Sequence, residues 1–336
     1  MDMPEGFSEF ISAMESLAEI HVGIETERQS TVLRLQQAKG NPRPTKLYHY
    51  TSLKGLGGIL QASCLWATDY RSLNDSTELA YGSKLVVETL ELWAEQVAEA
   101  DAWLLRQVSN LLKTHHDAYF GFFETYILSF SEASDVLSQW RAYADKARGH
   151  CLEFDLSDSS LFTVVDNNVP LGLELLPVIY EPDTQKAMID AAIEHILNYL
   201  HGTQWSPQTL QQATPNHEGV AVGMLIHALS PIILSFKHPG FSEEREWRAV
   251  ASCAPTMTAM TKKTRAAASG EAVYLECIFV QGDEERLWQR SHLPVSEIKH
   301  GPLAGGDAKL SADAIHRELG YEGNLAFTSS AVPLKA

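Results

Sequence analysis

The spacing of apolar residues along the chain predicts both helices and strands. Phe10, Met14 and Leu17 recur at helical intervals, and this pattern continues to about residue 37, before the segment NPRP. Short apolar runs bounded by turn residues predict strands. The expected strands are Lys46–Tyr50, Leu65–Tyr70, Tyr126–Phe130, Cys151–Phe154, Pro177–Tyr180, Trp247–Ser252, Leu275–Val280 and Leu325–Thr328.

Longer helical patterns separate these strands. A helix capped by Thr51 or Ser52 should follow the first strand. Further helices are expected at Ser76–Leu112, Ser138–Ala147, Thr184–His201 and His217–Phe236. Helices clustered between irregularly spaced strands indicate an α+β fold, with a mixed, mainly antiparallel sheet core and flanking helices. We expect an N-terminal helical arm over residues 1–44 and a single α+β domain over residues 45–336.

Two segments allow more than one interpretation. Gly219–Phe236 is apolar and near the lower length limit for a membrane span, but it contains His227 and Pro231. We therefore predict a buried core helix that bends near Pro231, and no membrane association. Ala254–Gly270 lacks periodicity and is predicted to be an exposed loop between strands.

Composition and charge narrow the class of protein. The chain has 336 residues, of which 45% are hydrophobic and 21% charged, as is usual for a globular protein. Its formal net charge of −17 argues against broad electrostatic binding to nucleic acid. The four cysteines form no CxxC pair, and the N-terminus does not resemble a signal peptide. We therefore predict a cytoplasmic protein with no disulfide framework and no structural zinc site.

Candidate site residues gather near strand ends. His49 and Thr51 share one face of the first strand, where they can bind a sugar hydroxyl. Asn74 and Asp75 form a polar loop that either caps the next helix or contacts a ligand.

Further candidates follow the middle strand. Ser129 and Ser131 share a face of that strand. On the helix that follows, Trp140 and Arg141 are suited to stacking on a planar ring and holding a phosphate, although Trp140 is equally compatible with a place in the core.

The densest cluster of charges runs from Phe241 to Arg248 and contains Glu244 and Glu246. At the entry of a strand these two carboxylates face the same way and can divide two catalytic tasks, one stabilising a cation and the other orienting a nucleophile. The alternative is a solvated charge run in which the acids pair with Arg245 and Arg248. No GxSxG, GxxxxGK[ST], HExxH or GxGxxG motif occurs.

Several motifs in this order resemble a bacterial domain-of-unknown-function family (DUF2971). The resemblance covers roughly Lys46 to Lys335. Its motifs are LYHYTS, LWATDYRSLNDSTE, LSFSE, LSQWRAYAD, GHCLEFD, FKHPGFSEEREWRAV, IKHGPLAG and SSAVPLK.

A more distant resemblance is to ADP-ribosyltransferases, in the order His-x-Thr, then an aromatic residue, then Glu-x-Glu. This resemblance implies an ADP-ribosyltransferase-like fold in which His49 and Thr51 hold the ribose of NAD as substrate. Glu246 would be the catalytic acid and Glu244 its helper, with Tyr50 at the nicotinamide carboxamide. The aromatic residue that stacks on nicotinamide would be Tyr70, Trp140 or Tyr143.

The favoured hypothesis is an enzyme of the toxin or anti-phage effector type that transfers ADP-ribose from NAD to an unidentified macromolecule. Two alternatives stay open. One is a non-catalytic protein that binds a nucleotide-like molecule or a partner, in a cleft formed by His49, Asn74, Trp140 and Glu246. The other is a metal-dependent hydrolase or nuclease that uses Asp75, Glu78, Glu244 and Glu246.

Overall fold

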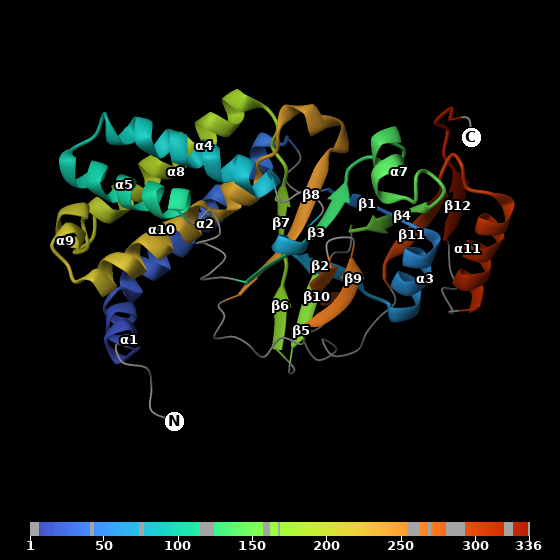
Figure 1. Ribbon diagram of the computed structural model, residues 1–336, viewed down its shortest axis with the longest axis horizontal. Coiled ribbons are helices and arrows are strands. Elements are labelled where there is room, and N and C mark those ends of the chain that lie inside the picture. Colours follow the sequence, from blue (N-terminus) through green and yellow to red (C-terminus); the bar gives the residue numbers. More distant parts are fainter. Residues whose placement is uncertain are drawn as a thin grey trace. The chain divides into compact units, whose positions relative to one another are not determined.

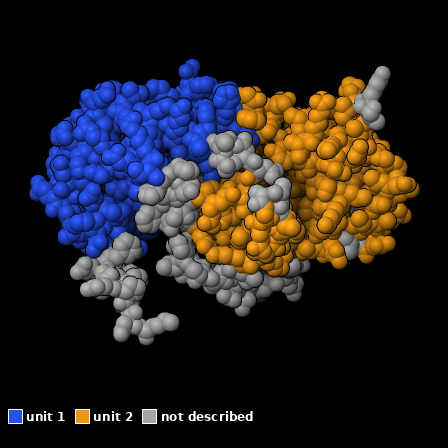
Figure 2. Space-filling model, viewed as in Figure 1, with its two compact units in different colours: residues 1–42, 75–123, 178–239 blue, residues 43–74, 124–177, 240–336 orange. Residues whose placement is uncertain are grey.

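The computed structural model groups the chain into two compact units (Figure 2). One comprises residues 1–42, 75–123 and 178–239, and is called the helical unit below; the other comprises residues 43–74, 124–177 and 240–336, and is called the sheet unit. The predicted arm over residues 1–44 thus shares a unit with later helices, and the partition into an arm and a single domain stays a prediction. The described residues are 7–40, 44–73, 77–114, 124–156, 162–166, 169–253, 262–267, 270–279, 293–318 and 325–334.

The helical unit is built around one apolar helix, α10 (Pro215–Ser235). Its N-cap is Thr214, whose side chain accepts from the backbone N–H of His217, and Pro215 occupies the first turn. The helix is long and apolar enough to cross a membrane, yet 72% of its apolar window is buried inside the structure. The predicted buried core helix is therefore confirmed, with Pro231 inside it.

The other helices of this unit pack on α10 and on each other (Figure 1). The helical pattern predicted up to about residue 37 is interrupted at Leu17, so it forms two helices rather than one. The helices are α1 (Phe7–Ser16), α2 (Ala18–Ala38), α4 (Thr77–Ala94), α5 (Glu99–Thr114), α8 (Pro182–His201) and α9 (Pro207–Gln211).

The described residues of the sheet unit form twelve strands. Nine of them follow the order β12-β11-β4-β1-β3-β2-β10-β5-β6, while β8 pairs with β3 and β7, and β9 pairs with β10. All these ladders are antiparallel except the parallel pair β11–β12, so the expected mixed, mainly antiparallel sheet is confirmed (Figure 1). The strands are β1 (Lys46–Thr51), β2 (Leu65–Asp69), β3 (Glu124–Ser131), β4 (His150–Asp155), β5 (Phe162–Asp166), β6 (Val169–Gly172), β7 (Glu174–Pro177), β8 (Glu246–Cys253), β9 (Lys263–Ala267), β10 (Gly270–Phe279), β11 (Val295–His300) and β12 (Ala326–Ser329).

Helices cover both faces of the sheet near β1. Leu47 and Phe154 oppose each other in the ladder and pack with the apolar residues of α3 (Leu53–Ala62) and α11 (Gly306–Glu318). Tyr50 and Cys151 oppose each other on the other face, where they pack with Trp140 of α7 (Leu137–Tyr143). We call these the α3 face and the α7 face. Because side chains alternate along a strand, the two faces of β1 contribute to two separate apolar clusters.

The structure corrects three expectations. Residues 263–267 form β9 rather than part of a loop, because they pair with β10. Lys263 lies opposite Tyr274 at one end of this ladder, and Ala267 lies opposite Gly270 at the other. The strand expected at Pro177–Tyr180 ends at Pro177, and Ile179 makes only an isolated bridge to Phe236. The helix expected to reach Ala147 ends at Tyr143, because residues 145–147 have positive φ angles of 46°, 53° and 72°.

Candidate functional site

The sheet opens beside the middle of β3. On one edge, β3 pairs with β8 along its whole length, with Glu124 opposite Cys253 at one end and Ser131 opposite Glu246 at the other. On the other edge it pairs with β2 at Tyr126 and Ile127, and with β1 at Ser131. In the described ladders, residues 128–130 therefore have no strand partner on that second edge. Strands β1 and β2 diverge around this stretch.

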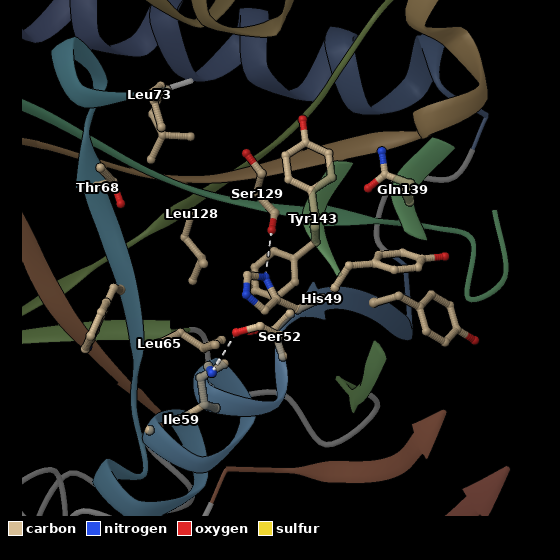
Figure 3. A pocket seen from close by; sticks show the side chains of 18 of the residues that line it. His49, Ser52, Ile59, Leu65, Thr68, Leu73, Leu128, Ser129, Gln139 and Tyr143 are labelled. Atoms are coloured by element: carbon tan, nitrogen blue, oxygen red, sulfur yellow. Dashed lines mark hydrogen bonds between the residues drawn. The ribbon is translucent and has the colours of Figure 1, made fainter. Parts of the chain in front are cut away.

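A cavity of about 720 Å³ occupies this opening. It is lined by residues of β1, β2, β3, α3 and α7 (Figure 3). Strand β9 and the two carboxylate residues Glu244 and Glu246 also line it. Because α3 and α7 cover opposite faces of the sheet, residues from both faces line the cavity. A hollow of this size accommodates a nucleotide-sized ligand.

His49 lies on the cavity wall and is fixed by the open stretch of β3. Its Nδ1 lies 3.2 Å from the carbonyl oxygen of Ser129 (Figure 3), and its ring meets Phe130 edge-on at 6.0 Å. A carbonyl only accepts, so Nδ1 is the donor and Nε2 is left as an acceptor in the neutral ring. Burial lowers the pKa of His49, which favours that neutral form.

Glu246 reaches the same residue from the other side. The Ser129 hydroxyl donates to Glu246 Oε1 at 2.8 Å. The Arg248 guanidinium donates to both carboxylate oxygens, through Nε at 2.9 Å and Nη2 at 3.2 Å. Ser129 thus joins His49, through its backbone carbonyl, to Glu246, through its hydroxyl. Both residues therefore contact Ser129 and line one cavity, but the ladder registers place the His49 side chain on the α3 face of the sheet and the Glu246 side chain on the α7 face.

Glu244 lines the cavity just before β8, at the end of the 3-10 helix η2 (Pro239–Glu244). Its backbone carbonyl accepts from the Ser131 hydroxyl at 2.7 Å. Arg245, which follows it, has a positive φ of 45°. Ser131 therefore fixes the sharp turn that brings Glu244 and Glu246 to the cavity, and it does not itself line the cavity.

Three more predicted residues, Tyr50, Thr51 and Ser129, line the cavity. The Tyr50 hydroxyl donates to Ala133 O at 2.7 Å and accepts from Val136 N at 3.1 Å, so the hydroxyl already makes hydrogen bonds within the protein. Burial raises the pKa of Tyr50, and its phenol is neutral at physiological pH.

Trp140 is not a cavity residue, which corrects its expected stacking role. Its side chain is 0% exposed, its Nε1 donates to Asp135 at 2.6 Å, and its ring meets Tyr50 edge-on at 4.8 Å. Of the three aromatic candidates, only Tyr143 lines the cavity, and it is 43% exposed.

The remaining predicted residues lie away from the cavity lining or outside the described structure. Tyr70 is buried beneath the Arg71 guanidinium. Arg141 is exposed, and Arg248 is buried behind Glu246. Asn74 and Asp75 lie outside the described residues, as does the side chain of Glu78.

Several lining residues escaped the sequence analysis, namely Lys54, Trp66, Gln139 and Arg265. The alternation of side chains in LWATD could have indicated Trp66, because it places Trp66 on the face of the strand opposite the buried Leu65 and Ala67. Arg265 gave none, because its strand lies in the segment predicted to be a loop. Within the described part of the chain, no three His, Cys, Asp or Glu residues are grouped to hold a metal ion.

Comparison with known proteins gives a family match over one segment of the chain and no activity. Neither the curated proteins nor the solved structures yield a match to this chain. The ADP-ribosyltransferase resemblance therefore stays a prediction. Residues 139–249, which include Gln139, Glu244 and Glu246, match the model of the family described as protein of unknown function (DUF2971), and this confirms the predicted family resemblance over that segment.

Proposed function

We propose that the cavity binds NAD and that the protein is an ADP-ribosyltransferase-like enzyme that transfers ADP-ribose to a macromolecule. The observation that carries the proposal is the convergence of His49 and Glu246 on Ser129, at distances of 3.2 Å and 2.8 Å, in the wall of a 720 Å³ cavity. An imidazole acceptor and a carboxylate that line one cavity suit a ribose whose glycosidic bond is to be broken.

Each residue has a role in this proposal. His49 accepts a hydrogen bond from a ribose hydroxyl through Nε2, and Tyr143 stacks on nicotinamide. The C1′–N bond breaks, and nicotinamide leaves with the electron pair. The Glu246 carboxylate stabilises the cationic ribose, while the acceptor attacks C1′ and gives its proton to Glu244.

The acceptor is a macromolecule of unidentified class, as in the toxin and anti-phage effector enzymes that motivated the hypothesis. With a net charge of −17, attraction over the whole surface does not recruit nucleic acid. Recognition of the acceptor therefore depends on local contacts near Glu244.

A second candidate is binding of the nucleotide without turnover. The observation that favours it is the two-pronged contact from Arg248, whose positive charge offsets that of the Glu246 carboxylate. A carboxylate offset in this way stabilises a cationic ribose less strongly.

The test is release of nicotinamide from NAD, with and without cell lysate. The wild-type protein should release nicotinamide, and Glu246→Gln should lower the rate about 100- to 1000-fold. Glu243→Gln is the matched control, because Glu243 is exposed and does not line the cavity. Equal rates in wild type and a folded Glu246→Gln protein would refute the catalytic role. NAD binding without nicotinamide release would establish the second candidate.

A further inference from the structure

Two side chains in the cavity wall have no part in the proposed bond-breaking step. Trp66 on β2 is 41% exposed although it is a large aromatic residue. Its ring stacks on Tyr274 with centroids 4.4 Å apart, and the Arg265 guanidinium carbon lies 5.8 Å from its centroid. The Nε of Arg265 is buried and has no hydrogen-bond partner among the described residues.

The ladders place this pair on the same face as Glu246. Ser131 opposes Glu246, and Ile127 opposes Thr68, so the side chains of Ser129, Thr68 and Trp66 share the α7 face of the sheet. Tyr274 opposes Thr68 across the ladder of β10 with β2, and so lies on that face too.

Arg265 belongs to this surface, and across the described ladder of β9 with β10 it faces no charged residue. It opposes Ala272, whereas Lys263 on the same strand is paired with Glu276 at 2.8 Å. Its unmatched donor and the exposed indole therefore form one part of the cavity wall. The carboxylates of Glu244 and Glu246 come from separate elements, η2 and β8.

We propose that Trp66 and Arg265 form a nucleobase-and-diphosphate subsite, in which the exposed indole stacks on the base and the guanidinium binds the phosphates. An aromatic ring stacks on any base, and guanidinium fits phosphate oxygens with two donors. The inference rests on the proposed function, since it seats the adenosine diphosphate part of NAD on the Trp66 side of the opening. In this arrangement the phosphates bind Arg265 and lie apart from the Glu244 and Glu246 carboxylates, which face the ribose.

The test is calorimetric titration with ADP, adenosine and inorganic pyrophosphate, none of which requires turnover. The wild type should bind ADP more tightly than either fragment. Trp66→Ala should weaken ADP and adenosine by roughly 10- to 100-fold and change pyrophosphate much less, because the indole contacts the Arg265 guanidinium but donates no hydrogen bond to the phosphates in this subsite. Arg265→Ala should weaken ADP and pyrophosphate and leave adenosine unchanged.

Two further variants keep the result interpretable. Trp66→Phe should restore most of the ADP affinity, and Arg148→Ala, which removes an exposed cation away from the cavity, should bind as wild type does. Absence of ADP binding to the wild type, or unchanged affinity in both alanine variants, would overturn the inference. ADP binding that depends on Trp66, combined with intact NAD in the turnover assay, would uphold this subsite and refute only the enzymatic proposal.

Discussion

Replacing Glu246 by glutamine should destabilise the protein strongly, because it removes the negative charge from a buried ion pair. The Glu246 and Arg248 side chains are 8% and 2% exposed, and they meet at 2.9 Å. Glutamine keeps an oxygen that accepts from Ser129 but loses the negative charge opposite the guanidinium. Breaking a buried ion pair on one side costs about 3–5 kcal/mol.

A double substitution separates the charge from the packing. Glu246→Leu with Arg248→Met removes both charges and keeps similar volumes, so its free energy of unfolding should lie within about 1–2 kcal/mol of the wild type. Arg248→Met alone should cost as much as Glu246→Gln does. The double variant should nevertheless lose nicotinamide release, since the carboxylate at the cavity is gone.

The assay is urea unfolding followed by tryptophan fluorescence, which reports on the buried Trp140 and Trp247 of the sheet unit. Glu243→Gln is the exposed control and should change stability by less than about 0.5 kcal/mol. A loss below about 1 kcal/mol for Glu246→Gln would refute the reasoning, because it would mean that water screens the pair.

Other predictions concern the sheet unit outside the Glu246–Arg248 ion pair. Burial and the neighbouring His300 lower the pKa of His150 to about 4 from 6.5. The unfolded chain therefore takes up that proton first, and His150 should contribute a fall in stability of about 3 kcal/mol as pH drops from 6.5 to 4. Urea unfolding at each pH measures this fall, and His150→Asn should remove the contribution of this residue. Gly55→Ala should cost about 1–3 kcal/mol of stability, because the added Cβ would lie 2.1 Å from the hydroxyl oxygen of Thr51. Gly58→Ala should stabilise the helix by about 0.5–1 kcal/mol, because its added Cβ meets nothing within 4 Å. Equal Tm shifts in the two variants would contradict this. Asp135→Ala should cost about 1–3 kcal/mol, since its carboxylate accepts from Trp140, Ser330 and the N–H of Ala331. Unchanged hydrogen exchange at residues 330–334 would contradict that role.

The sequence predicted those elements whose burial follows a simple period. Strand β1 and helix α3 were expected at nearly their observed bounds, and the Ser52 side chain caps α3 by accepting from Gly55 N. Helix α10 was recognised because its apolar residues cover most of its surface. In contrast, β9 (KTRAA) and β11 (VSEIKH) carry polar residues that become strand residues only through pairing with β10, β4 and β12. Pairing between distant segments leaves little trace in local periodicity.

For the candidate site too, the sequence predicted positions at strand ends but not the contacts that depend on pairing between distant segments. His49, Glu244 and Glu246 were chosen from their places at strand ends, and all three line one cavity. The burial of Glu246 with Arg248 was not foreseen, because a dense charge run usually lies in solvent. Here β8 pairs on both edges, with β3 and with β7, and this double pairing carries the run into the interior.

Trp140 was misplaced for a related reason. Its polar atom is satisfied five positions earlier by Asp135, so the whole indole is buried in the cluster under α7. A hydrogen-bond partner of that kind is invisible in helical periodicity. Trp66 and Tyr143 stood out less in the sequence than Trp140, but they are the exposed aromatic residues that line the cavity.

The most direct test of the account is a crystal structure of the protein with a non-cleavable NAD analogue. The account predicts density in the opening between β1 and β2, with a ribose hydroxyl within hydrogen-bond distance of His49 Nε2 and the Glu246 carboxylate beside C1′. An analogue bound elsewhere, or a cavity that stays empty at saturating analogue concentration, would contradict the proposal that this opening is the NAD site.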